Sequence, residues 1–137
     1  HQTVTAGIRT EENDDTRYSE MPAFGRFDIL ENEQIDQVVN FVMSLSGEPM
    51  DASLVSDGAT VYADNCASCH GEGGLGDREQ GAPNLADAIW LFGGSYEDIR
   101  ETVYSSRYGV MPSWDTRLTE AQIRAVSAYV HQLGGGE

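Results

Sequence analysis

The two cysteines of this 137-residue chain lie close together and are followed directly by a histidine. They form the run Cys66-Ala67-Ser68-Cys69-His70, a C-x-x-C-H sequence, which is the attachment signature for c-type haem. Two residues between the cysteines let both sulfurs reach the vinyl groups on adjacent edges of a porphyrin. The residue after the second cysteine then projects under the iron, where His70 can supply an imidazole nitrogen as proximal ligand. The motif therefore predicts one covalently attached haem c.

Two other kinds of site use a cysteine pair of this spacing, a thioredoxin-like redox pair and half of a zinc site. A thioredoxin-like pair opens a helix that follows a buried strand, whereas this pair ends a segment with a helical pattern. A zinc site needs a second pair of ligands, and the chain has only two cysteines. Haem attachment is therefore the favoured interpretation.

An electron-carrying haem usually takes a second strong ligand from the protein, and Met111 is the candidate. It precedes Pro112, lies between two expected helices and follows His70 by 41 residues. A soft thioether favours ferrous iron and so raises the reduction potential. The alternative for a single methionine is packing in the core. The neighbouring proline favours binding to the iron, and so does an internal repeat around Met111, which is described below.

Further residues are expected to orient and enclose the cofactor. The second nitrogen of a ligating histidine needs a hydrogen-bond acceptor, and the loop Gly81–Leu85 offers the carbonyl of Pro83. Leu85 in the same loop is a further candidate for contact with the haem. The apolar residues available to exclude water from it are Trp90, Leu91, Phe92, Ile99, Val103, Leu118 and Tyr129.

The chain contains an internal repeat. The segment from Arg17 to Pro22 recurs as the segment from Arg107 to Pro112, at an offset of 90 residues. Apolar positions then recur at an offset of 88 residues, with Leu30, Ile35, Val38, Phe41, Val42 and Leu45 matching Leu118, Ile123, Val126, Tyr129, Val130 and Leu133. Residues 1–47 therefore look like the back half of a unit, and a linker at 48–52 precedes the complete copy at 53–137.

Both repeated tails have the pattern of an amphipathic helix. In the second tail Thr119 and Gln122 form a capping box, and Gly134–Gly136 end the helix. Residues 33–46 have the same design and end at Gly47.

The complete unit is expected to begin with a helix at about 53–66 that runs into the cysteine pair. A glycine-rich loop over 71–81, a short helix near 86–92, and a helix capped by Ser95 and Asp98 should follow. No segment alternates with a period of two for long enough to predict strands. The fold class is all-α, with loops of a length that suits wrapping a large cofactor.

The charge of the chain restricts its partners. The formal net charge is −15, and every cationic side chain is an arginine. Such a chain repels nucleic acid and anionic lipid and attracts basic proteins, although an acidic surface can also serve solubility alone. No apolar run reaches the roughly 18 residues of a transmembrane helix, and no signal peptide is visible. The abrupt start at His1 is compatible with a missing anchor or leader.

The motifs together resemble a known family. The run Cys66–His70, the segments Gly81–Leu85 and Trp90–Gly94, and Met111-Pro112-Ser113-Trp114 are similar to the second cytochrome c domain of the di-haem subunit of bacterial cbb3-type cytochrome c oxidases. Ile99 and Arg107 fit the same pattern, and Gly58, Tyr62 and Tyr129 match the crossing-helix contact of class I cytochromes c.

The resemblance implies a class I cytochrome c fold over residues 53–137, preceded by the C-terminal half of a first such domain at 1–47. It implies a periplasmic subunit with a transmembrane anchor. It also implies a haem–copper oxygen-reducing subunit and a companion cytochrome c subunit as partners, with a basic soluble cytochrome c as an expected donor. The chain lacks the anchor and the first C-x-x-C-H motif. Met21 would ligate a first-domain haem attached outside this chain, so one haem is expected here and two in the intact family subunit.

The expected function is an electron relay to a terminal oxidase in aerobic respiration, and the chain is not expected to be an enzyme by itself. One alternative is a cytochrome c domain that serves a periplasmic dehydrogenase, with the same ligands and other partners. Another is a haem sensor or peroxidase in which Met111 is displaced and the iron binds a gas or peroxide.

Overall fold

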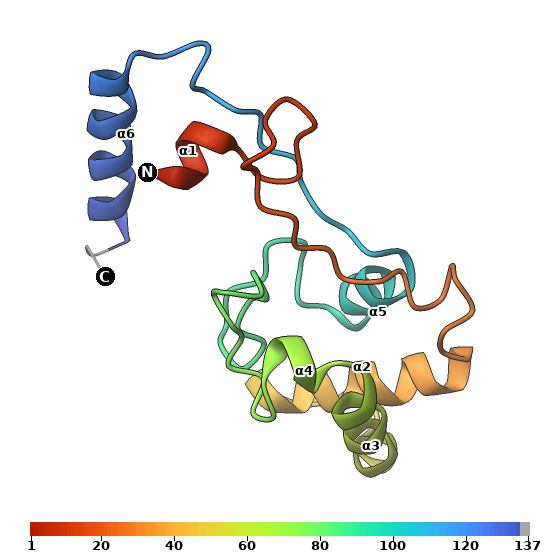
Figure 1. Ribbon diagram of the computed structural model, residues 1–137. Coiled ribbons are helices and arrows are strands. Elements are labelled where there is room, and N and C mark those ends of the chain that lie inside the picture. The colour runs from red at the N-terminus through yellow and green to blue at the C-terminus, as the bar shows by residue number, and fades with distance from the viewer. Residues whose placement is uncertain (135–137) are drawn as a thin grey trace. The chain divides into compact units, whose positions relative to one another are not determined.

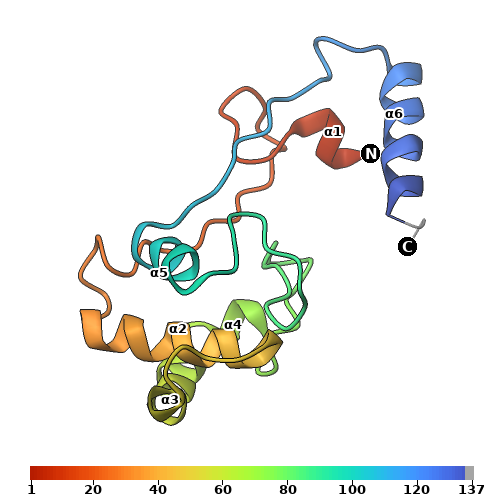
Figure 2. The same cartoon turned by 180° about the vertical axis from the view of Figure 1, so that it is seen from behind.

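The structure is a computed structural model that describes residues 1–134, and its regular elements are helical (Figures 1 and 2). They are α1 (Gln2–Ala6), α2 (Asn32–Ser46), the 3-10 turn η1 (Ala52–Leu54), α3 (Val55–Asn65), α4 (Ala67–His70), α5 (Tyr96–Ser105) and α6 (Glu120–Leu133). Within residues 1–134, the only β-type pairings are isolated bridges. The all-α class expected from the sequence is confirmed.

The longer helices begin where the capping residues predict. The hydroxyl of Ser95 accepts a hydrogen bond from the Asp98 backbone N–H at 3.1 Å and starts α5. Thr119 and Gln122 form a reciprocal capping box at the start of α6. In α2, the side-chain oxygen of Gln34 accepts from the backbone N–H of Glu31 at 3.0 Å. These bonds satisfy N–H groups that a helix start leaves without a partner.

The prediction of a short helix near 86–92 is wrong, because that segment forms bends and turns. The side-chain oxygens of Asn84 and Asp87 each accept a backbone N–H two residues on, at 2.8 Å. Such local bonds compete with the helical hydrogen-bond pattern. The sequence also gave no indication of α1. The helix stop expected at Gly134–Gly136 is described only at Gly134, which follows the last residue of α6.

The chain separates into two compact units. The attachment unit is Glu20–Arg107, and the terminal unit combines His1–Ser19 with Tyr108–Glu137. This division differs from the boundaries near residues 47 and 53 expected from the sequence, because α2 packs against α3 and α5 within the attachment unit. The domain organisation drawn from the repeat stays a prediction.

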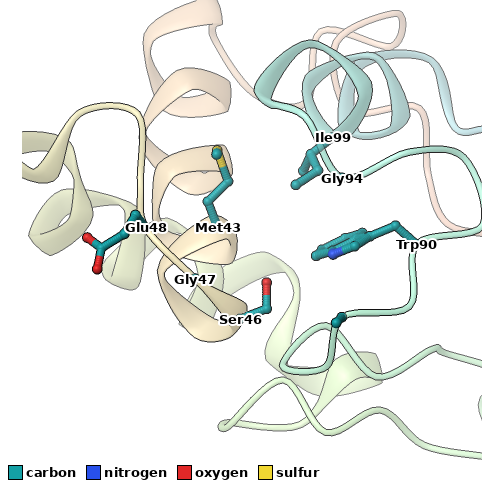
Figure 3. Close-up of a pocket in the computed structure, with 8 residues that line it drawn as sticks. Met43, Ser46, Gly47, Glu48, Trp90, Gly94 and Ile99 are labelled. Atoms are coloured by element: carbon teal, nitrogen blue, oxygen red, sulfur yellow. The ribbon is translucent and has the colours of Figure 1, made fainter.

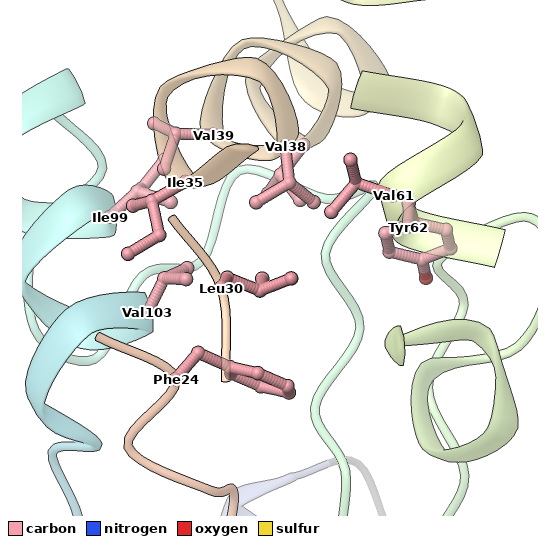
Figure 4. Close-up of a cluster of buried hydrophobic side chains, with 10 residues drawn as sticks. Phe24, Leu30, Ile35, Val38, Val39, Val61, Tyr62, Ile99 and Val103 are labelled. Atoms are coloured by element: carbon pink, nitrogen blue, oxygen red, sulfur yellow. The ribbon is translucent and has the colours of Figure 1, made fainter. Parts of the chain in front are cut away.

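The core of the attachment unit lies where α2 meets α3 and α5 (Figure 4). Its buried members are Phe24, Leu30, Ile35, Val38, Val39, Val42, Val61, Tyr62, Ile99 and Val103. Four of these ten residues, Ile35, Val38, Val39 and Val42, form the apolar stripe of α2, and Leu30 lies just before that helix. That stripe therefore has a partner along its length, which is where an amphipathic helix gains most of its stability.

The backbone of α3 lies close to that of α2 at Gly58. A Cβ atom there would lie 2.1 Å from the carbonyl oxygen of Gln37 in α2. Beside this point the rings of Phe41 and Tyr62 lie 4.9 Å apart at an interplanar angle of 50°. Gly58 and Tyr62 thus make a helix-crossing contact with α2, where Phe41 is the aromatic partner. Tyr129 belongs to the terminal unit, so its expected contact with them stays a prediction.

A polar contact also joins α2 to α5. Asp36 accepts hydrogen bonds from the Arg100 Nε atom at 2.7 Å and from the Tyr96 hydroxyl at 2.8 Å. The side chains of the ion pair are about one-third exposed, so solvent screening limits its contribution to under about 1 kcal/mol. The contact therefore orients the two helices more than it stabilises them.

The segment before α2 is bound along the end of α5. The backbone N–H of Phe24 donates to the carbonyl oxygen of Val103, and that of Gly25 donates to Tyr104, both at 3.2 Å. The hydroxyl of Ser106 donates to the carbonyl oxygen of Met21. The Met21 side chain is half-buried and packs against the core.

In the terminal unit, α1 lies against α6, and Ile8 exchanges two backbone hydrogen bonds of 3.0 Å with Met111. Ile123 is the buried residue of α6. Its other apolar positions are exposed, namely Val126, Tyr129, Val130 and Leu133. Among the described residues, no helix has the length and apolar character needed to cross a bilayer.

The crossing predicts that Gly58→Ala destabilises the protein. Alanine normally stabilises a helix interior by about 1 kcal/mol relative to glycine. Here the added methyl overlaps the Gln37 carbonyl, and overpacking of this kind costs about 1–3 kcal/mol. Urea unfolding followed by circular dichroism measures the change. Gly47→Ala is the control, because a Cβ there meets nothing within 4 Å. A Gly58→Ala protein as stable as the control would contradict the prediction.

Candidate haem-attachment site

The attachment motif lies on one helical turn at the end of α3. The backbone N–H of Cys66 donates to the Tyr62 carbonyl at 2.8 Å, and that of His70 donates to the Cys66 carbonyl at 2.9 Å. These bonds hold α3 and α4 as nearly continuous helix, with Cys66 between them. Both thiols are free, Cys66 half-buried and Cys69 exposed. The turn therefore presents two sulfurs and an imidazole from a fixed backbone.

The imidazole of His70 has the partner that the sequence predicts. Its Nδ1 atom lies 3.0 Å from the carbonyl oxygen of Pro83. A carbonyl can only accept, so Nδ1 carries the hydrogen, and Nε2 is the nitrogen left to bind a metal. A ligating histidine generally needs this second contact to fix its tautomer and ring orientation.

The loop that carries Pro83 is folded onto the motif by backbone bonds. Gly76 N–H donates to the His70 carbonyl at 2.9 Å, and Asp77 and Ala82 exchange bonds of 3.0 and 2.9 Å. At Gly76, φ is +79°, and a Cβ would lie 2.6 Å from the Ala82 carbonyl oxygen. Only glycine suits this turn. Leu85, which donates to the Gly74 carbonyl at 2.6 Å, is half-buried against the core.

Tyr62 connects this loop to the core. Its ring is buried between the helices, and its hydroxyl donates to the Gly71 carbonyl at 2.8 Å. Burial, with a smaller contribution from Cys66, raises the pKa of Tyr62 to about 12. The hydroxyl therefore remains a donor across the physiological pH range.

Arg107 holds the next part of the loop against α5. Its Nη2 atom donates to the carbonyl oxygens of Phe92 at 3.2 Å and Asp98 at 2.5 Å, and its guanidinium lies over the Phe92 ring. The same arrangement of cation and ring recurs elsewhere. The other pairs are Arg9 with Tyr108, Arg100 with Tyr104, and Arg117 with Trp114.

The loop from residue 71 to 94 presents apolar side chains to solvent. Leu75 is 71% exposed, Ile89 82% and Leu91 87%. Exposed apolar groups collected on one segment indicate a surface that another body covers. With two free thiols and an oriented imidazole on the adjoining turn, the donor set and the apolar loop both fit a covalently held porphyrin.

A cavity of about 270 Å³ lies beside α2 in the same unit (Figure 3). Its lining is Met43, Ser46, Gly47, Glu48, Ala88, Trp90, Gly94 and Ile99. Trp90, expected near the haem, faces this cavity and packs against the core. Neither cysteine nor His70 lines it, so the cavity is distinct from the attachment turn.

The predicted site residues divide between the units. Met21, Cys66, Cys69, His70, Pro83, Leu85 and Trp90 belong to the attachment unit. Met111 and Tyr129 belong to the terminal unit. Sequence reasoning assigned Met21 to a haem outside this chain, although the repeat itself marks Met21 as the counterpart of Met111. Among residues 1–134, no three His, Cys, Asp or Glu side chains gather as they would around a bare metal ion.

Comparison with known families gives a match over the attachment turn and the residues that follow it. The profile of the family described as cytochrome C oxidase, cbb3-type, subunit III matches residues 53–130. These residues include the attachment turn, the loop with Pro83, and Met111.

Curated relatives match along the whole chain. The CcoP subunit of a cbb3-type cytochrome c oxidase from Cereibacter sphaeroides is 58% identical over 137 residues, which are 100% of this chain and 47% of the relative. The FixP subunit from Sinorhizobium medicae is 47% identical over 100% of this chain and 47% of its own length. The CcoP subunit from Azospirillum sp. B510 is 44% identical over 100% of this chain and 49% of its own length. The chain thus spans about half the length of the curated relatives that it matches.

Before haem attachment, the two cysteines should differ in reactivity. Burial, followed by the charge of Cys69, raises the pKa of Cys66 to about 11. At pH 8 about one Cys66 side chain in a thousand is then the reactive thiolate, and the fraction rises about tenfold per pH unit up to pH 11. Iodoacetamide pulses followed by peptide mass analysis should label exposed Cys69 first. Urea-unfolded chain, the control, should lose the difference, and equal labelling in the folded chain would contradict the prediction.

Proposed function

We propose that this chain, which belongs to the family of subunit III of cbb3-type cytochrome c oxidases, relays single electrons through one haem c bound to Cys66, Cys69 and His70. The observation that carries the proposal is the pairing of the C-x-x-C-H turn with the Pro83 carbonyl. A redox pair of thiols does not need an adjacent imidazole held in one tautomer, whereas a histidine that binds iron generally does.

The protein supplies attachment, orientation and shielding, while the haem supplies the one-electron chemistry. The sulfurs of Cys66 and Cys69 would form the thioether links, and Nε2 of His70 would bind the iron. The Pro83 carbonyl polarises the imidazole through its Nδ1–H and raises its basicity. Tyr62 and Gly71 keep the turn attached to the core.

The sixth ligand in this proposal is a methionine, and the repeat together with the family resemblance favours Met111. A thioether ligand would favour the ferrous state of the haem. With His70 and a methionine both bound to the iron, the haem would have no free site for a gas or peroxide. This arrangement suits electron transfer and does not suit a sensor or a peroxidase.

The partners follow from the relatives and from the charge. The relatives are named as subunits of cbb3-type cytochrome c oxidases. The proposed acceptor is accordingly the haem–copper subunit of such an oxidase, with a companion cytochrome c subunit in the same complex. A net charge of −15 favours a basic soluble cytochrome c as donor. Attachment of haem c outside the bacterial cytoplasm places this function in the periplasm, with the membrane anchor belonging to the intact subunit.

The proposal predicts a mass equal to the chain plus one haem. Boiling in acidified organic solvent should leave the colour with the protein, because thioether bonds survive this treatment. The Cys66→Ser, Cys69→Ser double variant should release its colour, whereas Ser68→Ala, altered between the cysteines, should retain it. Colour extracted from the unaltered protein would end the proposal.

The same preparation separates relay from sensor. The ferric protein should show the weak absorption band near the red end that reports sulfur ligation, and the ferrous protein should bind carbon monoxide poorly. Ready binding of carbon monoxide by the unaltered ferrous protein would favour a sensor instead.

A further inference from the structure

We infer that Arg107 binds a propionate carboxylate of the haem and so holds the polar edge of the cofactor. The inference rests on the proposed attachment of haem to Cys66, Cys69 and His70, and it adds a residue for the opposite edge of the ring. A porphyrin of this type carries its two propionates at the edge away from the two vinyl groups. Those carboxylates need a partner that the attachment turn does not supply.

Arg107 is fixed in place by hydrogen bonds to neutral acceptors. Its Nε atom donates to the hydroxyl oxygen of Thr102 at 3.0 Å, and its Nη2 atom donates to the same oxygen at 2.7 Å. Nη2 also donates to the carbonyl oxygens of Phe92 at 3.2 Å and Asp98 at 2.5 Å. None of these acceptors carries a charge, so the bonds orient the guanidinium without neutralising it.

The other arginines of the attachment unit are either paired or solvated. Arg100 is paired with the carboxylate of Asp36 at 2.7 Å, and Arg26 and Arg78 are exposed to water. Arg107 is half-buried, and none of the ion pairs among residues 1–134 includes it. Removing a cation from water costs free energy unless an anion compensates for the loss. In a chain with 23 acidic side chains, a half-buried arginine that pairs with none of those described indicates an anion from outside the polypeptide.

The remaining nitrogen of Arg107 is available to such an anion. A guanidinium has five N–H groups in one rigid plane. Nε and Nη2 are used in the bonds above, whereas Nη1 has no hydrogen-bond partner among residues 1–134. Because the plane is rigid, the bonds to Thr102, Phe92 and Asp98 fix the direction of Nη1 as well. A donor that is oriented in advance binds a carboxylate at a reduced cost in entropy.

An aromatic ring adjoins this donor. The Arg107 Cζ atom lies 5.2 Å from the centroid of the Phe92 ring, and Phe92 is 38% exposed. An apolar surface next to an unpaired cation suits a ligand that is apolar over most of its area and anionic at its edge. A porphyrin with propionates has this composition.

Arg107 also binds the far end of the loop that the cofactor is expected to cover. That loop begins directly after the attachment turn and presents Leu75, Ile89 and Leu91 to solvent. Near its other end, the carbonyl of Phe92 accepts a hydrogen bond from Arg107. One end of the loop therefore adjoins the thiols that would bind the vinyl groups, and the other end adjoins an unpaired cation. The two ends match the two edges of the porphyrin.

Reduction potentials of the haem-loaded full chain test the inference. Arg107→Gln should lower the potential, because a propionate without its cation favours ferric iron over ferrous iron. Arg107→Lys keeps a positive charge near the carboxylate and should recover most of the shift. Arg78→Gln removes the same charge from an exposed position of the loop, where solvent screens it, and should shift the potential far less.

Equal potentials in Arg107→Gln and Arg78→Gln would overturn the inference and leave the proposed function standing. A potential of Arg107→Lys as low as that of Arg107→Gln would also overturn it. The bonds to Thr102 and Phe92, which lysine cannot reproduce, would then set the potential in place of the charge. Colour that acidified solvent extracts from the unaltered protein would instead reject the haem attachment, and the inference with it.

A measurement on the unaltered protein covers the case in which the Arg107 variants fail to take up haem. Phenylglyoxal modifies accessible arginine side chains, and peptide mass analysis locates the modified residues. Arg26, which is exposed and lies outside the loop, serves as the internal reference. Relative to Arg26, Arg107 should lose most of its reactivity when the haem-loaded chain is compared with the chain without haem. A ratio of the two reactivities that haem leaves unchanged would overturn the inference.

Discussion

The architecture of the attachment unit depends on the absence of a side chain at Gly58. Without a Cβ at that position, α2 and α3 approach until their backbones are in contact, with the Phe41 and Tyr62 rings packed beside the crossing. Because α3 leads into the cysteine pair, this contact also sets the direction in which the attachment turn leaves the core. The hydroxyl of Tyr62 then reaches the Gly71 carbonyl, so one residue joins helix packing to the loop that follows the motif.

From that point the site is built mainly by backbone bonds and needs few side chains. Gly76, with its positive φ, lets the loop return to His70, and the return brings the Pro83 carbonyl to the imidazole. Arg107 binds the later part of the loop through two carbonyl oxygens. Such bonds hold a shape without requiring a large apolar core, which a domain of this size cannot supply. The apolar side chains of the loop consequently remain outside, where a cofactor can cover them.

Much of this organisation is predictable from the sequence, because the signals are local. The starts of α5 and α6 follow from capping residues, and the contact of His70 with Pro83 follows from the chemistry of an iron ligand. The helix predicted at 86–92 does not form, because two Asx turns outweigh a weak helical pattern. The packing of α2 on α3 cannot be predicted from apolar periodicity, because residues 118–133 carry the same pattern. The ion pair of Asp36 with Arg100, which joins α2 to α5, likewise becomes visible only in the structure. The roles of Cys66, Cys69 and Met111 toward a haem stay predictions.

The arginines that lie over aromatic rings affect the electrostatic field that the protein produces in the surrounding solvent. Four of the eight arginines have their guanidinium carbon over an aromatic ring of the protein in this way. Positive charge is thereby fixed in place, while carboxylates on flexible stems outnumber it and dominate the field outside. In dilute buffer of about 0.01 M that field extends roughly 30 Å, farther than the length of α2 at about 22 Å. A cationic macromolecule would accordingly be turned toward the chain before any atoms touch, and added salt would remove that guidance.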